Sequence, residues 1–186
     1  MYKNINEIKI EDLKKNYQMI HYFGLGFIQL KLNDTYRLHF YTDKISKILD
    51  EEEVHNHRYD FASYVLKGKF NMKLFKTIEG NEFTIDDEDC KNHDEEDGVI
   101  TNKKVETYGI QKISENNYSA GDSYWLEKDT FHRVKGNECI TLLERGDVVK
   151  KYAQVLTPVN KEKVCPFSKK IEEEGLWKVV EEMLAA

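Results

Sequence analysis

The chain has 186 residues, 40% of them hydrophobic and 33% charged, which is typical of a single domain with a substantial core. Its 28 lysines and arginines against 34 aspartates and glutamates give a net charge of −6, the wrong sign for a protein that follows a phosphate backbone. No apolar run is long enough to span a membrane and no signal peptide opens the sequence, so we expect a soluble, cytoplasmic protein without a nucleic-acid or membrane partner.

The cysteines point to no structural framework. Cys90, Cys139 and Cys165 are an odd number and contain no CxxC spacing, which argues against a set of disulfides and against a cysteine-built zinc site. Each is expected to be a free thiol or a small core residue.

Both prolines lie within the last 30 residues, and no glycine- or serine-rich linker interrupts the chain before them. We therefore divide the chain into an N-terminal helical segment over residues 1–25, a central domain over 26–160 and a C-terminal helix over 161–186. Apolar residues at helical spacing predict helices over 6–20 and 168–184. Ser168 is a candidate N-cap for the second helix, and Trp177 is expected to anchor it against the central domain.

The central residues have the pattern of short antiparallel strands. Alternation on both sides of Asn33-Asp34 predicts a hairpin over 26–41, and Gly68 is expected to end a strand at 59–66 and begin a second hairpin with 70–75. Further strands are predicted at 82–85, 105–113, 123–126, 132–134, 140–144 and 148–156. Many short strands joined by turns indicate an all-β sandwich or barrel.

One stretch between the strands is strongly acidic. Residues 86–98 carry eight acidic side chains and one lysine. A calcium-binding loop has acidic oxygens at alternate positions around a central glycine, and this stretch has neither that register nor that glycine. We interpret it as a solvated, mobile loop rather than a metal site.

Three of the six histidines form a pattern that suits a metal ion. His55 and His57 are two residues apart, so in an extended chain both imidazoles point to the same face. His132 follows a turn at Gly121 and a predicted strand, 75 positions after His57. Neutral imidazole is a common ligand for zinc, iron, nickel and copper. The alternative is that these histidines are ordinary polar residues at strand ends.

These residues resemble the two sequence motifs of the cupin superfamily. His55, His57 and Gly68 fall on the first motif, and Gly121 and His132 fall on the second. The similarity extends over residues 36–156. It implies an all-β cupin barrel, also called a double-stranded β-helix or jelly roll, with short N-terminal and C-terminal helices and one divalent metal ion in its open mouth.

The sequence departs from both motifs at identifiable positions. Leu49 replaces the first glycine, and Glu127 and Asp129 replace the proline and glycine of the second motif. The glutamate ligand of the first motif falls on Phe61 or Ala62, and neither can bind a metal. The resemblance therefore implies three histidine ligands and no carboxylate.

A three-histidine site is similar to that of the thiol dioxygenases, the cysteine dioxygenase group. The strings HNHRYDFASYVLKG and FHRVKG are also locally similar to that group. The resemblance implies Fe(II), with nickel, zinc and manganese as alternatives, and an oxygenase that acts on a small polar substrate such as a thiol. Three neutral ligands leave an iron dication with its full charge and with open positions for substrate and dioxygen.

Other functions stay open at this point. Residues 154–158 lack the tyrosine and histidine that the thiol dioxygenases place near the metal, so the substrate is not carried over. A metal-dependent isomerase or lyase and a non-catalytic small-molecule-binding protein are the two alternatives. The expected partner is a small-molecule substrate or ligand, and a homodimer is an open alternative to a monomer.

Several other side chains are candidates for the walls of the site. Arg37, His39 and Tyr41 share one face of a predicted strand and are candidate substrate-binding residues. Arg37 is a candidate substitute for the arginine that grips the substrate carboxylate in the thiol dioxygenases. For His39, a hydrogen-bonded wall residue is favoured over a fourth ligand or a general base. Paired surface residues are the alternative for Arg37 and Tyr41.

Residues close to the histidines have supporting roles in this interpretation. Asp60 is expected to accept a hydrogen bond from an imidazole N–H rather than to bind the metal directly. Tyr124 and Trp125 are expected in the core, with lining of the pocket by one of them as the alternative.

Overall fold

The computed structural model describes residues 2, 4–47, 53–88, 101–161 and 171–186, with side-chain positions for all of these except 88 and 101–105. Within these ranges, nine strands form one sheet, and short helices lie at both ends of the chain. The elements in chain order are η1 (Ile5–Glu7), α1 (Ile10–Asn16), β1 (Met19–Phe23), β2 (Phe27–Lys31), β3 (Tyr36–Tyr41), β4 (Val54–His55), β5 (Phe61–Glu88), β6 (Thr101–Ser119), β7 (Ser123–Leu126), β8 (Phe131–Arg145), β9 (Ala153–Pro158) and α2 (Glu173–Ala185).

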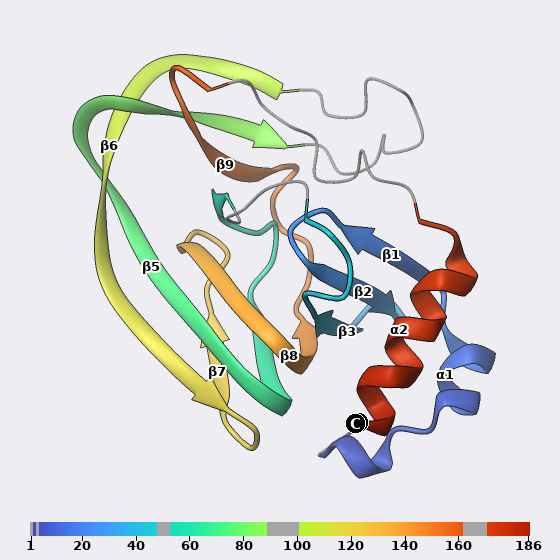
Figure 1. Cartoon of the computed structure of the whole chain (residues 1–186). Coiled ribbons are helices and arrows are strands. Elements are labelled where there is room, and N and C mark those ends of the chain that lie inside the picture. Colours follow the sequence, from blue (N-terminus) through green and yellow to red (C-terminus); the bar gives the residue numbers. More distant parts are fainter. Residues whose placement is uncertain (1, 3, 48–52, 89–100, 162–170) are drawn as a thin grey trace.

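The sheet closes on itself. Its strand order is β1-β2-β3-β8-β4-β9-β5-β6, and an additional pairing joins β5 to β8. The strands β8, β4, β9 and β5 therefore form a closed antiparallel ring, and β7 pairs with the start of β5. The predicted all-β barrel with short N-terminal and C-terminal helices is confirmed (Figure 1).

Alternation along β2 and β3 gives this part of the sheet two different faces. Ile28, Leu30, Leu38 and Phe40 have no exposed surface and belong to a cluster that includes residues of both helices. The residues between them point the other way, into the barrel. The hairpin predicted over 26–41 is confirmed, and Asn33 accepts hydrogen bonds from two backbone N–H groups in its turn.

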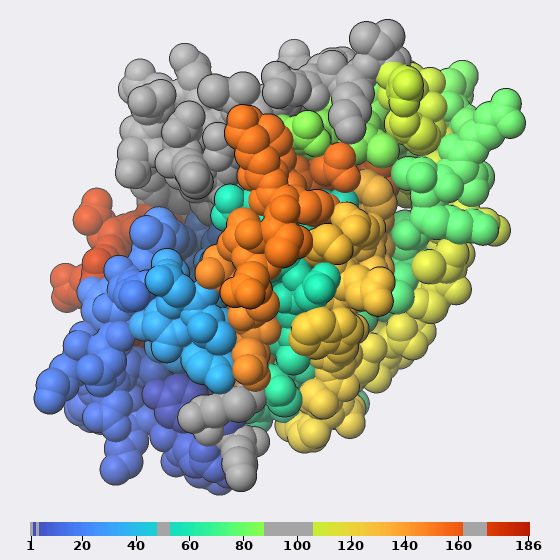
Figure 2. Space-filling model, turned by 180° about the vertical axis from the view of Figure 1, so that it is seen from behind, coloured from blue at the N-terminus to red at the C-terminus, as the bar shows by residue number. Residues whose placement is uncertain are grey.

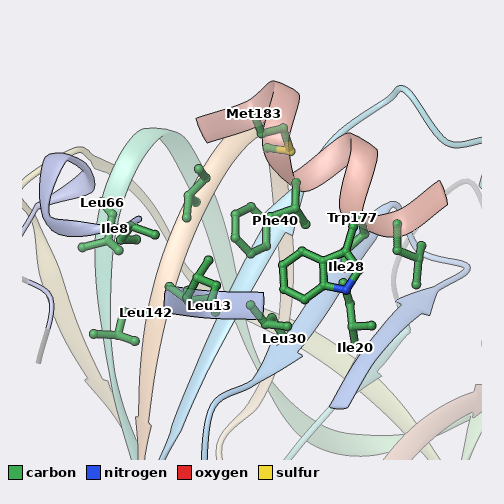
Figure 3. Packing of buried hydrophobic residues seen from close by; sticks show 14 of the residues in the cluster. Ile8, Leu13, Ile20, Ile28, Leu30, Phe40, Leu66, Leu142, Trp177 and Met183 are labelled. Atoms are coloured by element: carbon green, nitrogen blue, oxygen red, sulfur yellow. The ribbon is translucent and has the colours of Figure 1, made fainter. Parts of the chain in front are cut away.

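The two helices lie side by side over one outer face of the sheet (Figure 1). The rings of Tyr17 and Trp177 meet edge to face at 5.0 Å, and Lys14 pairs with Glu181. Trp177 is buried and points from α2 toward the strands, as does Met183 (Figure 3). The predicted anchoring of the C-terminal helix by Trp177 is therefore confirmed.

The N-terminal helix is shorter than predicted. The helix expected over 6–20 is replaced by η1 and α1, which ends at Asn16, and the chain then enters β1. Ile20 pairs with Leu30 across the β1–β2 hairpin, whose turn uses Gly26 with a φ of +95°. Pairing with β2 therefore overrides the helical spacing of Ile20.

The second predicted hairpin is wrong. β5 continues through Gly68 as one strand of 28 residues, and its register against β8 shifts on each side of Lys67. Gly68 has a φ of +77°, a conformation that glycine adopts without the steric penalty of a side chain. A glycine at a β-bulge bends a strand without ending it, so this residue curves the barrel wall instead of turning the chain back.

The other predicted strands are recovered with changed lengths. The strand at 123–126 is β7, while 132–134 and 140–144 are parts of the single strand β8. The segments 82–85 and 105–113 lie within β5 and β6, and the strand expected over 148–156 begins only at Ala153. Seen from behind, a column of orange residues runs between the blue N-terminal residues and the yellow residues on the other side of the molecule (Figure 2).

Some sequence-based expectations fall outside the described residues. These are the acidic residues 89–98, the cap at Ser168, and the positions of Leu49, Cys90 and Cys165. Cys139 is a free, fully buried thiol, and burial raises its pKa to about 12. Among the described helices, none has both the length and the apolar character to cross a membrane.

Candidate metal centre

The three predicted histidines meet inside the barrel. His55 ends β4, which lies between β8 and β9, and His55 is the direct cross-strand partner of His132 on β8. His57 follows two residues later, and its backbone N–H donates to the carbonyl of Lys128 at 3.1 Å. The ring closure of the sheet therefore brings together side chains that are 75 residues apart in sequence.

The imidazole nitrogens of the three residues converge. One ligand atom from each of His55, His57 and His132 lies within 4.8 Å of the others, and the Nε2 atoms of His57 and His132 are 3.3 Å apart. The Nδ1 atom of His55 lies 3.0 Å from the carbonyl oxygen of Glu53, and that of His132 lies 3.1 Å from the carbonyl of Thr130. Since a carbonyl only accepts, both Nδ1 atoms carry a proton, and in a neutral imidazole of this tautomer the lone pair lies on Nε2.

The surroundings hold two of these imidazoles in the neutral form. Burial lowers the pKa of His57 well below its ordinary value, and the charges of His132 and His55 lower it further. Burial likewise lowers the pKa of His132, with His55 as the second cause. A neutral imidazole offers a lone pair to a metal, so these shifts favour ligation over proton binding.

The donor set fits a divalent transition metal. Two nitrogens bound at about 2.0–2.1 Å to one tetrahedral ion lie about 3.3 Å apart, which is the observed separation of the two Nε2 atoms. Hydrogen bonds from Nδ1 to backbone carbonyls fix the orientation of ligand histidines in known metal sites, and two of the three histidines have them. Three imidazoles suit zinc, iron, nickel or copper and do not distinguish among them.

The position of the missing carboxylate is occupied by an aromatic ring. Phe61 is 3% exposed, lines the site, and its ring centroid lies 4.9 Å from that of His57. Ala62 points to the opposite face of β5, where its cross-strand partners are Trp125 and Glu144. Of the two candidate positions, Phe61 is therefore the one beside the histidines.

A cavity of about 400 Å³ opens over the histidines, and the three candidate substrate-binding residues line it. Arg37, His39 and Tyr41 enter it from β3, as the shared strand face predicts. His39 lies 3.0 Å from the Nε2 atom of Gln29 and is outside the three-histidine group. Burial, together with the charge of Arg37, lowers the pKa of His39 to about 3. The geometry matches the interpretation of His39 as a hydrogen-bonded wall residue.

Arg37 is held at the cavity by a tyrosine. Its Nη1 donates to the hydroxyl of Tyr59 at 3.0 Å, and its Nε is buried with no hydrogen-bond partner among the described residues. The guanidinium groups of Arg37 and Arg145 lie 5.5 Å and 5.2 Å from the Tyr59 ring centroid. Tyr59 in turn stacks on His57 at 5.5 Å, so it connects the two guanidinium groups to the three-histidine cluster.

Asp60 does not have the role expected for it. Its Oδ1 accepts a hydrogen bond of 2.7 Å from the backbone N–H of Lys128, whereas the imidazole Nδ1 atoms of His55 and His132 face backbone carbonyls. Because the carbonyl of Lys128 accepts from the N–H of His57, Asp60 acts on the site through the backbone.

The expectation for Trp125 is also wrong. Its side chain is 60% exposed, while Tyr124 on the opposite face of β7 lines the cavity. The alternative that one of these two residues lines the pocket is therefore confirmed for Tyr124.

Sequence reasoning missed a residue that lies between two of the histidines. Asn56 is 1% exposed and bonds to Gln154 of β9 three times, through its backbone N–H, its Oδ1 and its Nδ2, at 2.8–3.1 Å. The Nε2 of Gln154 also donates to Asp87 at 3.2 Å. The sequence signal that could have pointed to Asn56 is its position between the two histidines of the HxH pair.

Comparisons with known proteins give distant structural similarities. No family model matches the chain, and no curated protein matches it in sequence. A crystal structure of the hydroquinone 1,2-dioxygenase PnpCD in complex with Cd2+ and 4-hydroxybenzonitrile aligns with a TM-score of 0.37 and 10% identity, over 80% of this chain and 79% of that one. A hydroquinone 1,2-dioxygenase from Sphingomonas sp. TTNP3 with 4-hydroxybenzoate bound aligns with a TM-score of 0.31 and 12% identity, over 62% and 63%.

The fold and the site together define a class. The chain is an antiparallel β-barrel protein with terminal helices and a three-histidine cluster that could hold one metal ion inside the barrel.

Proposed function

We propose that His55, His57 and His132 bind one divalent metal ion and that this ion is iron. We further propose that the protein is a mononuclear oxygenase of the thiol dioxygenase type, which acts on a small substrate. The convergence of three imidazoles, in a group that contains no carboxylate among the described residues, carries this proposal. When bound, iron would supply Lewis acidity and redox chemistry with dioxygen.

The protein's own residues orient the donors and shape the cavity. Backbone carbonyls fix the Nδ1–H tautomers of His55 and His132, so their Nε2 lone pairs are presented without rearrangement. Phe61 excludes water from one side of the histidines. Arg37 lines the cavity, and its guanidinium suits the acidic group of a substrate.

Metal content tests the first part of the proposal. Wild-type protein should purify with close to one divalent metal ion per chain, and His57→Ala or His132→Ala should lose it because two imidazoles remain. His21→Ala is the matched control, since His21 lines the same cavity outside the three-histidine group. Mass spectrometry identifies iron, nickel, zinc or manganese. Full metal retention in both ligand variants would refute the site.

Oxygen uptake tests the second part. Iron-loaded protein should consume dioxygen with at least one compound from a panel of small thiols, and His132→Ala should abolish the uptake. Stoichiometric metal without uptake across the panel would remove the oxygenase proposal. The isomerase or lyase alternative, in which the ion acts only as a Lewis acid, would then be preferred.

A further inference from the structure

The two apolar clusters of the molecule differ in chemistry. Among the described buried residues, 3 of the 15 in the cluster shared with the helices are aromatic, against 5 of the 10 in the cluster inside the barrel. Ligand pockets are lined predominantly by hydrophobic and aromatic side chains. The concentration of rings on the cavity side therefore calls for an explanation beyond core packing.

The rings line the cavity as a connected series. Phe23 stacks on Phe27 with centroids 4.6 Å apart and planes 11° from parallel, and Phe27 lies 5.1 Å from Tyr41. Tyr41 lies 5.3 Å from Phe70, which stacks on Tyr124 at 5.9 Å and 11°. All five line the cavity, and each pair lies in the range of favourable aromatic contacts. We call these five residues the ring wall.

The ring wall continues to the histidines. The Tyr124 ring lies 6.2 Å from Phe61, which meets the imidazole of His57 edge to face at 4.9 Å. A ligand lying against the ring wall can therefore reach the converging Nε2 atoms with a substituent. The cavity of about 400 Å³ is at the small end of ligand pockets and has room for a one-ring compound.

The charges at the cavity favour an anion. Its described lining contains the cations Lys31, Arg37 and Arg58 and one carboxylate residue, Glu53. A cleft with an excess of one charge raises the local concentration of ligands of the opposite charge.

We propose that the cavity selects a small molecule that has a single aromatic ring and an acidic group. The ring would pack on the ring wall, and the acidic group would lie toward the cationic lining. The proposal rests on the proposed function in taking this cavity as the substrate site, and it narrows the small substrate, a thiol included, to one that carries an aromatic ring and an acidic group.

Benzoate and cyclohexanecarboxylate test it as matched probes, because they share a carboxylate and ring size and differ in aromaticity. Calorimetric titration of the protein as purified should show benzoate binding at least about twofold more tightly, the lower end of the gain from an added aromatic pair. Phe23→Leu and Phe70→Leu should each reduce this ratio toward one. Trp125→Leu is the control and should keep it, since Trp125 is exposed and outside the cavity lining.

Three results would overturn the proposal: equal affinity for the two probes, no binding of either, or an unchanged ratio in both leucine variants. Phe23 is only partly buried, so Phe23→Leu should fold even if Phe70→Leu does not. Metal content is measured on the same samples. If the proposed metal site is wrong, the samples will contain no metal. If the proposed selection of an aromatic ring is wrong, the ratio of the two affinities will be one.

Discussion

At the scale of single residues, the candidate metal centre depends on short polar contacts that fix backbone as well as side chains. The carbonyls that hold His55 and His132 each belong to the residue two positions earlier, so the local chain path sets the imidazole orientation. His57 has its backbone N–H tied to Lys128. The orientation of the His55 and His57 imidazoles therefore depends on how the segment around Asn56 is held.

Asn56 is predicted to position the metal ligands without touching the metal. Asn56→Ala removes two side-chain hydrogen bonds to Gln154 and frees the segment between His55 and His57, so metal affinity should fall by about 10- to 100-fold, as for other residues that support ligands. Chelator competition well below the melting temperature measures this. Asn71→Ala is the control, because it loses amide hydrogen bonds to Glu115 and Asn117 away from the cavity. Equal affinities in the two variants would contradict the positioning role.

The clustering of the three histidines could be predicted from the sequence, whereas the hydrogen bonds that hold the segments around them could not. The HxH spacing places two imidazoles on one face in any extended segment, so His55 and His57 are visible without a structure. The contact between Asn56 and Gln154 joins residues 98 apart, and the placement of Asp60 depends on the turn at Lys128. Such contacts form only when the strands close into a barrel, and no local sequence pattern predicts that closure.

At the scale of elements, the curvature of β5 decides where the barrel closes. This strand pairs with β6, β7, β8 and β9 along its length, so the bend at Gly68 positions several partners at once. The sequence indicates a break at this glycine, because a hairpin turn and a bulge both use φ > 0. A turn and a bulge differ in which strand pairs with the residues before the glycine. Here that strand is β8, which lies about 70 residues further along the chain.

Two glycines allow the effect of this bulge to be measured. Gly68→Ala places a methyl group against the carbonyl oxygen of Glu138, and its φ is +77°. Gly121→Ala has a φ of +97° with nothing within 4 Å of the new methyl group. Gly121→Ala should cost about 1–2 kcal/mol of unfolding free energy from backbone strain alone. Gly68→Ala should cost clearly more, because the overlap with β8 is added. Urea unfolding measures both, and equal losses would show that the close approach to β8 is unimportant.

At the scale of the whole molecule, the two faces of the sheet separate stability from chemistry. The face under α1 and α2 holds the largely aliphatic cluster, which shares no residue with the three histidines or with the described cavity lining. The opposite face carries the ring wall, the cationic side chains and the three histidines. Alternation along β2 and β3 produces both faces from one hairpin, which explains why sequence reasoning could place Arg37, His39 and Tyr41 together.

Phe61 offers the sharpest test of the combined picture, because it stands where a carboxylate ligand is missing. Phe61→Glu would place an acidic group beside His57, reduce the effective charge of a bound ion and occupy a position that substrate or dioxygen needs. We expect metal to be retained or bound more tightly, with loss of the oxygen uptake that the parent shows with its best thiol. Ala62→Glu is the matched control, since Ala62 points away from the cavity on the adjacent position of β5 and should keep the uptake. Because Phe61 is buried, circular dichroism must first show that its variant is folded. A folded Phe61→Glu protein with full oxygen uptake would mean that the space beside His57 is not used in the reaction.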